Sequence, residues 1–118
     1  MDKTENKKTG NIGEQIATEY LVTIGYKIIN RNLKLICGEI DILAEYKKII
    51  VIVEVKTVRG SGFGLAQDLV RYKKKKKLLN LARSIEQKYP NRQLRIDVIG
   101  VSLDYNPPKI EHIENAVN

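Results

Sequence analysis

The sequence predicts a protein of the α/β (α+β) class, in which a central mixed β-sheet is flanked by helices in the order αβββαββ. Three observations lead to this class. Residues 39–45 and 49–57 are rich in Ile and Val, which is typical of buried strands. Apolar residues recur at helical spacing in residues 11–24 and again before Pro90. Strand-like segments lie on both sides of that second helix, which is the pattern of a sheet covered by helices.

Length and charge restrict the possible roles of the chain. Its 118 residues are 42% hydrophobic, which predicts one folded domain over residues 10–118 after a mobile tail at 1–9. No apolar run approaches the ~20 residues of a membrane span, and the charged N-terminus has no signal-peptide core, so we expect a cytoplasmic protein without a membrane partner. The formal net charge of +7 favours nucleic acid as a partner.

The first helix and the first strand are predicted from their end signals. Asn11 is a good N-cap and Gly25 stands where a helix stop belongs, so the helix is expected over 11–24. Glu14 then falls at the third helical position, where it could complete a capping box, a role compatible with one in a functional site. The following segment, 26–34, predicts a strand that contains a bend.

The two Ile- and Val-rich strands are expected to form a hairpin. A two-residue turn pairs Tyr46 with Ile49, and a four-residue loop gives the same register. In this register Asp41 lies directly opposite Glu54, with Cβ atoms about 4.5–5.5 Å apart, close enough for two carboxylates to hold one divalent cation. The two central residues are both lysine, which is unfavourable in a type I′ turn, and a register slip of one residue would move Asp41 to the other face.

The second half of the chain is predicted to contain a glycine-rich loop, a basic helix and two strands. Residues 58–64 carry three glycines, so they form either a plain connector or a loop that approaches phosphate. The helix is expected over 67–89, with its regular part starting near Leu69 after a loop or separate turn, and it is stopped by Pro90. Strands follow at 93–103 and 109–113. The second of these strands carries the lone histidine, His112, which is expected to be a surface residue because no His or Cys partner stands at metal-ligand spacing.

Five consecutive lysines in the second helix are the strongest candidates for phosphate contacts. Successive residues of a helix turn by about 100°, so these side chains point almost all round it and most must be solvated. Lys74 and Lys75 border the apolar side of this helix, so either could lean toward the sheet. The predicted nucleic-acid-binding residues are Lys73, Lys74, Lys75, Lys76, Lys77 and Arg59.

Three charged residues interrupt the two apolar strands and form the predicted catalytic constellation. Asp41 and Glu54 supply the hard oxygen ligands that Mg²⁺ or Mn²⁺ prefers. Lys56 lies two residues beyond Glu54 and therefore on the same face of the strand. An ammonium group there could stabilise the charge that develops on a phosphate.

The motifs around these residues resemble the YraN-like family of uncharacterised bacterial proteins, within the PD-(D/E)xK nuclease superfamily. The resemblance covers roughly residues 10–116. It includes the sequences Gly-Glu-Ile-Asp ending at Asp41, Val-Glu-Val-Lys-Thr ending at Thr57, and Arg-Ile-Asp-Val around Asp97, with Gly13-Glu14 in the first helix. Two departures are Ile40, where the superfamily signature has proline, and Val58, which separates Thr57 from Arg59.

The resemblance implies a restriction-endonuclease-like core and a set of site residues. Asp41 and Glu54 would be metal ligands with the backbone carbonyl of Val55, Lys56 would be the catalytic lysine, and Glu14 would add a further carboxylate from the first helix. Its relatives include Holliday-junction resolvases, which cleave branched DNA with a divalent metal. By analogy with them a homodimer is one alternative for the oligomeric state.

Three hypotheses therefore remain open from the sequence. The chain is a metal-dependent endonuclease-like protein that acts on DNA, a nucleic-acid-binding module that keeps the nuclease fold without appreciable catalysis, or a protein whose lysine neutralises its two carboxylates in a buried ion network. The last alternative involves no ligand.

Overall fold

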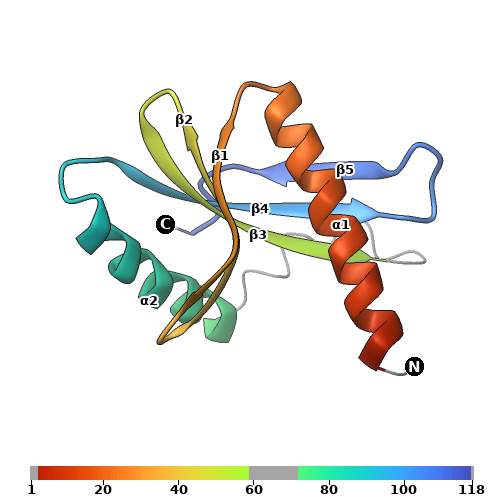
Figure 1. Ribbon diagram of the computed structural model, residues 1–118, viewed down its shortest axis with the longest axis horizontal. Helices are drawn as coiled ribbons and strands as arrows, with labels where there is room; N and C mark the ends of the chain where they lie inside the picture. Colours follow the sequence, from red (N-terminus) through yellow and green to blue (C-terminus); the bar gives the residue numbers. More distant parts are fainter. Residues whose placement is uncertain (1–2, 59–71, 118) are drawn as a thin grey trace.

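The computed structural model describes residues 3–58 and 72–117 and has a five-stranded sheet with two helices (Figure 1). The elements are α1 (Lys3–Thr23), β1 (Lys27–Leu35), β2 (Gly38–Tyr46), β3 (Ile49–Val58), α2 (Tyr72–Lys88), β4 (Leu94–Ser102) and β5 (Lys109–Ile113). The strands lie in sequence order; β3 and β4 are parallel, and the other neighbouring pairs are antiparallel. The predicted mixed α/β class is confirmed.

Helix α1 begins earlier than the sequence predicted. It starts at Lys3, so the predicted start at Asn11 is wrong, and residues 3–9, expected to form a tail, have helical backbone. Lys and Glu in this stretch are good helix formers and outweigh the penalty of Gly10. The capping-box role of Glu14 is also wrong, because this residue lies well inside the helix.

The predicted end of α1 is confirmed at Gly25. This residue has a φ of 99°, a left-handed conformation that favours glycine. Its amide donates to the carbonyl of Val22 at 3.1 Å, and the amide of Tyr26 donates to the carbonyl of Leu21 at 2.9 Å. These two bonds satisfy carbonyls of the last helical turn before the chain enters β1.

The hairpin of β2 and β3 has the predicted register. Tyr46 pairs with Ile49, and Lys47 and Lys48 between them have φ values of 49° and 70°. Positive φ at both central residues is what a type I′ turn requires. The lysines adopt it in a hairpin whose strands bury Ile and Val side chains in the cores on both faces of the sheet.

Helix α2 ends close to the predicted stop. Of the predicted range, residues 67–71 lie outside the described part of the chain, and the helix ends at Lys88, two residues before Pro90. Leu78, Leu81 and Ile85 are at most 1% exposed and form its buried face. Neither described helix is long and apolar enough to cross a membrane.

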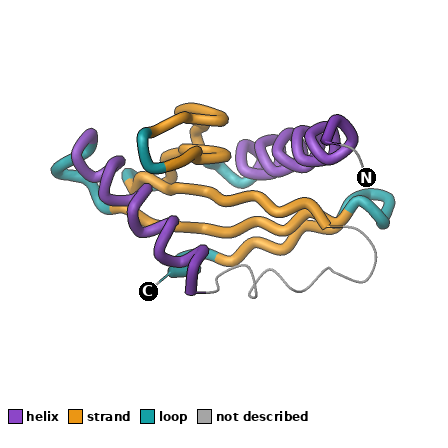
Figure 2. The backbone as a smooth tube through the Cα atoms, turned by 90° about the horizontal axis from the view of Figure 1, so that it is seen from below, coloured by secondary structure: helices purple, strands orange, loops and turns teal. Residues whose placement is uncertain are grey.

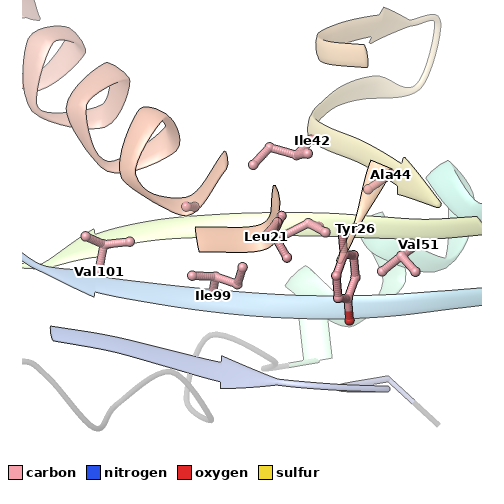
Figure 3. Close-up of a cluster of buried hydrophobic side chains, with 9 residues drawn as sticks. Leu21, Tyr26, Ile42, Ala44, Val51, Ile99 and Val101 are labelled. Atoms are coloured by element: carbon pink, nitrogen blue, oxygen red, sulfur yellow. The ribbon is translucent and has the colours of Figure 1, made fainter. Parts of the chain in front are cut away.

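The two helices cover opposite faces of the sheet, because alternate residues of β3 pack into two separate cores. Val51 and Val53 belong to the core under α1, whose buried members are Ala17, Leu21, Tyr26, Ile42, Ala44, Val51, Val53, Ile99 and Val101 (Figure 3). Ile50 and Ile52 belong to the core under α2, with Ile40, Leu43, Leu78, Leu81, Ile85, Ile96 and Val117. Figure 2 shows the two helices lying apart, each against the strands.

Strand β2 divides its length between two neighbours. It pairs with β1 from Gly38 to Glu45, but its regular pairing with β3 ends at Ile42 opposite Val53. Beyond that pair the β1–β2 hairpin bends away from the rest of the sheet (Figure 1). We call the point where the two strands separate the fork; it lies between Asp41 on β2 and Glu54 on β3.

Candidate functional site

The fork brings together the central residues predicted from the sequence. Asp41 directly precedes Ile42, and Glu54 directly follows Val53, the two residues of the last regular pair of β2 and β3. One carboxylate oxygen of Asp41, Oδ2, accepts a hydrogen bond from the backbone amide of Val55 at 2.8 Å. Glu54 is only 9% exposed, whereas Lys56 is exposed. The Asp41 carboxylate is therefore bonded to the residue that follows Glu54 in β3, and the exposed lysine comes one residue later.

The backbone of Val55 is also directed toward the fork. In an antiparallel pair, a hydrogen-bonded residue offers its N–H and its C=O to the same neighbour. Because the Val55 N–H bonds to the Asp41 side chain, its carbonyl points toward the same edge of β3. Asp41 thus occupies the place that the backbone of β2 would take if the ladder continued.

A second group of polar side chains lies on the neighbouring surface, where α1 meets the β1–β2 hairpin. In the amide orientation that satisfies its neighbours, Asn32 donates to a carboxylate oxygen of Glu14 at 2.9 Å and to one of Glu39 at 3.0 Å. Asn32 has a φ of 52°, which asparagine tolerates better than most residues. These residues line an open pocket of about 450 Å³ together with Gly10, Asn11 and Lys34.

Burial makes the carboxyl group of Glu14 more basic than usual. Partial burial raises its pKa, and the negative charges of Glu39 and Glu54 act in the same direction. The hydrogen bond from Asn32 and the charge of Arg31 lower it without cancelling the effect. Burial is the largest of these effects on the pKa of Glu14, and the charge of Glu54 is the smallest.

The predicted set of Asp41, Glu54 and Glu14 is not gathered into one cluster of ligands. Among residues 3–58 and 72–117, no group of three or more His, Cys, Asp or Glu side chains is arranged to hold a metal ion. Glu14 instead contacts Asn32. Asp41 and Glu54 therefore stand at the fork, whereas Glu14 is bridged by Asn32 to Glu39 beside the pocket.

A close approach of helix to strand holds Glu14 near the sheet. A Cβ atom added to Gly13 would lie 1.8 Å from the Thr57 hydroxyl oxygen and 3.0 Å from the Thr57 Cβ. Only a residue without a side chain allows α1 to pack this closely on β3. Gly13 thereby fixes the position of the following carboxylate relative to the strand that carries Glu54 and Lys56.

The predicted phosphate-binding residues are only partly described. Lys73 and Lys74 belong to the backbone of α2, but their side chains lie outside the described part, as does the whole of Arg59. Lys75 is half-buried, and Lys76 and Lys77 are exposed. The three lysines of the run whose side chains the structure describes are therefore near the beginning of α2, where Lys77 lies beside Gly38 of the β1–β2 hairpin.

A buried polar network around Asp97 was missed by the sequence analysis. Asp97 is 0% exposed, and Arg95 donates to both its carboxylate oxygens, at 2.8 and 2.9 Å. Tyr26 donates to it at 3.3 Å and itself accepts a bond from Arg95, and the amide of Asn115 donates at 3.0 Å. Burial alone would raise the pKa of Asp97, but hydrogen bonds, with that from His112 the strongest, outweigh it and lower the pKa.

The expectation that His112 is a surface residue is wrong. Its side chain is 7% exposed, and its Nε2 lies 2.7 Å from Asp97. Because a carboxylate only accepts, Nε2 carries the hydrogen, and Nδ1 accepts from the Tyr20 hydroxyl at 2.9 Å when the ring is neutral. The spacing of Arg95 and Asp97, two residues apart on one strand face, was the available signal for a buried ion pair.

Glu111 is a further acidic residue that sequence reasoning did not single out. Lys56 on β3 pairs with Gly100 on β4, and Gly100 pairs with Glu111 on β5, so the three form one row across the sheet. Oε2 of Glu111 is buried without a hydrogen-bond partner in the described part of the chain. No signal in the sequence alone placed this residue in the row of Lys56.

Comparison with known proteins identifies the family but no activity. The chain is 41% identical over 123 residues to a UPF0102 protein of Caldanaerobacter subterraneus subsp. tengcongensis, covering 98% of this chain and 99% of the relative. A UPF0102 protein of Alkaliphilus oremlandii is 44% identical over 119 residues, covering 94% and 98%. The solved structure of Pyrococcus furiosus SfsA in complex with Ca²⁺ aligns with a TM-score of 0.34 and 17% identity, over 96% of this chain and 65% of that one.

The family model of UPF0102, described as an uncharacterised protein family, matches residues 13–101. This range includes the fork, the glycine contact with β3 and the Arg95–Asp97 pair. The YraN-like resemblance of the motifs is thereby confirmed at the level of the family. The chain belongs to the uncharacterised protein family UPF0102.

Proposed function

We infer that this chain is a Mg²⁺- or Mn²⁺-dependent endonuclease with a restriction-endonuclease-like core, acting on DNA and in particular on branched intermediates of the kind that Holliday-junction resolvases cut. The observation that carries this proposal is the fork. There the nearly buried Glu54 adjoins Val55, whose amide is bonded to Asp41. These are the positions that the nuclease resemblance assigns to the catalytic acids.

The donor set at the fork fits a hard divalent cation. Mg²⁺ is usually held by one or two carboxylates and keeps several waters, so the pair of Asp41 and Glu54 is sufficient, and the Val55 carbonyl points toward the same edge. A bound ion would supply Lewis-acid stabilisation of the charge on the reacting phosphate. It would also offset the repulsion between two carboxylates in a partly desolvated place.

The residues around the pair have separable roles in this proposal. The Val55 amide orients the Asp41 carboxylate. Lys56 shares a strand face with Glu54 and is exposed, so its ammonium group can contact a non-bridging phosphate oxygen and stabilise developing charge. Glu14 lies where α1 meets the β1–β2 hairpin, and partial burial raises its pKa, so its carboxyl group is a better proton acceptor than that of an exposed glutamate.

The test is cleavage of four-way-junction and linear DNA in the presence of Mn²⁺, with calorimetric titration of the metal alongside. We expect the wild type to cut at least one substrate and Glu54→Gln to lose both cutting and metal binding. Glu19→Gln, which removes an exposed carboxylate from α1, is the matched control and should behave as the wild type. A wild type that binds no metal and cuts neither substrate would refute the proposal, as would cutting that persists in Glu54→Gln.

A second candidate is a nucleic-acid-binding module that has the same fold but little catalysis. It is favoured by the exposed Lys76 and Lys77 and by the net charge of +7. It predicts binding that weakens steeply as salt is raised, because bound cations are released from the phosphates. Salt-sensitive binding by a protein that never cuts, even with Mn²⁺, would favour this candidate over the nuclease.

A further inference from the structure

The turn of the β1–β2 hairpin carries an apolar side chain that is unusually exposed. Ile36 has a relative exposure of 110%, more than in an extended reference peptide. The other exposed large hydrophobic residues of the described part lie between 37% and 56%. Singly exposed apolar side chains are common on protein surfaces, but they usually lie along a surface. This one stands at the tip of a hairpin that bends away from the sheet (Figure 1).

The tip is fixed in place although its isoleucine is not packed. The next residue, Cys37, has its sulfur 3.4 Å from the Ser84 hydroxyl and 3.8 Å from the Asn80 carbonyl oxygen, both on α2. Gly38 has a φ of 148°, and a Cβ added there would lie 3.5 Å from Lys77 and 3.6 Å from Leu81. The hairpin is thus held against α2 on one side of its turn, and Ile36 projects into solvent from a supported backbone.

Lysine residues stand beside this tip on both the hairpin and α2, with Glu39 opposite Lys34 in the β1–β2 ladder. Lys34 is exposed two residues before Ile36, and the side chain of Lys77 lies against Gly38 at the base of the turn. Lys76 is exposed on the same turn of α2. An apolar projection flanked by ammonium groups matches duplex nucleic acid, since lysines bind phosphates and an apolar side chain can enter between base pairs.

We propose that Ile36 is a wedge that inserts at a base step of duplex DNA bound along the β1–β2 hairpin and the start of α2. The inference rests on the proposed function, because it assigns a DNA contact to a protein inferred to act on DNA. Lys34 lines the pocket that contains Glu14 and Asn32, so the wedge and the candidate site lie on one hairpin. Ile36 is four residues from Asn32, about 13 Å along a strand.

A wedge at this place would unstack the duplex at the end of the hairpin remote from the fork. Side chains inserted between base steps partly unstack them and bend the helix. An opened step costs least where pairing is already interrupted, so the wedge would favour branched or mismatched duplexes over continuous ones. The inserted isoleucine makes no phosphate contact, so it changes DNA shape without changing the number of ions released.

The test uses short duplexes, each carrying 2-aminopurine at a different position, titrated with full-length protein in EDTA so that no cleavage occurs. We expect wild-type binding to raise the fluorescence of at least one duplex several-fold, because unstacked 2-aminopurine is brighter. Ile36→Ser should abolish this rise and leave the salt dependence of binding unchanged. Leu79→Ser, which removes another exposed apolar side chain from α2, is the matched control and should behave as the wild type.

The outcomes separate this inference from the proposed function. Wild-type protein that binds no duplex refutes the wedge, whereas the proposed function is decided separately by cutting of four-way-junction and linear DNA in Mn²⁺. Binding without a fluorescence rise, or a rise that persists in Ile36→Ser, refutes the wedge alone. Self-association of the wild type that Ile36→Ser disrupts would assign the tip to a contact between copies of this chain and would also overturn the wedge.

Discussion

Two glycines of α1 offer a direct test of how closely this helix packs on the sheet. Gly13 faces Thr57, and an added Cβ would lie 1.8 Å from the threonine hydroxyl oxygen. Gly10, three residues earlier, has no atom within 4 Å of such a Cβ. The same Gly→Ala change should therefore have opposite effects on stability at the two positions.

The magnitude follows from two competing contributions. Alanine inside a helix is favoured over glycine by about 0.5–1 kcal/mol. An extra methyl group forced into a packed site costs about 1–3 kcal/mol. Rotation of the Thr57 side chain cannot relieve the contact fully, because the Thr57 Cβ itself would lie 3.0 Å away. We expect Gly13→Ala to lose about 1–2 kcal/mol net, or about 4–8 °C in Tm, and Gly10→Ala to gain about 0.5–1 kcal/mol.

The assay is urea unfolding followed by circular dichroism, with a double-mutant cycle that adds Thr57→Gly. That change removes the three atoms nearest to the new methyl group, so Gly13→Ala should cost less in its presence, with a coupling of about 0.5–3 kcal/mol. Stabilisation by Gly13→Ala equal to that of Gly10→Ala would refute the reasoning. So would a cycle with no coupling, because the cost would then arise elsewhere.

Three further predictions concern the buried network and the basic helix. Asp97→Ala should lower the free energy of unfolding by about 3–5 kcal/mol, because it leaves Arg95 buried without its partner. The exposed control Glu86→Ala should change this free energy by less than about 0.5 kcal/mol. Equal effects of the two changes in urea titrations would contradict this prediction. Because the folded-state pKa of Asp97 lies below its ordinary value of 3.8, its contribution is complete above that pH and is lost as pH falls through the lower value, so the stability difference between wild type and Asp97→Asn should shrink on acidification below about pH 4. A difference that grows there would show that the sign is wrong. Replacing Lys76 and Lys77 by Glu should flatten the plot of log affinity against log salt by about 0.9 for each phosphate that the protein no longer neutralises; an unchanged slope in DNA titrations would exclude this part of α2 from the interface.

The strands were predictable because Ile and Val recur through residues 39–45 and 49–57. Their register followed from the short connection, since a two-residue turn that pairs Tyr46 with Ile49 and a four-residue loop predict the same pairing. The turn itself argued against that pairing, since lysine rarely adopts the positive φ seen at Lys47 and Lys48. Burial of a whole strand outweighed an unfavourable turn of two residues.

The start of α1 and the polar network were not predictable in the same way. Asn11 has the chemistry of an N-cap, but whether a helix starts at such a residue depends on what precedes it. Asp97 and His112 meet through the pairing of β4 with β5, which brings together residues from separate segments. A charge inside an apolar strand signals that some partner exists, but its identity depends on tertiary contacts.

The candidate site also combines features that the sequence predicted with features that it did not. Sequence periodicity predicts Asp41 opposite Glu54, and the register observed as far as Ile42 and Val53 is the one that this prediction requires. The bridge from Asn32 to Glu14 and Glu39 requires a left-handed residue on β1 and a helix packed across it, neither of which leaves a periodic signal. Local alternation therefore predicts which side chains share a strand face, while contacts between a helix and an edge strand emerge only from the folded chain.

The carboxylate of Asp97 also has a consequence for how the molecule opens. It joins β4 to Tyr26, which directly precedes β1, to β5 and to residue 115, while the amide of Ala116 donates to the carbonyl of Ile96 at 2.7 Å. A short edge strand such as β5 would normally fray far more readily than the sheet it borders. Here fraying of β5 would leave the buried charge of Asp97 without its partner His112. The amides of β5 should therefore exchange their hydrogens with solvent almost as slowly as those of the central strands. The network thereby turns the weakest edge of the sheet into part of its single cooperative unit.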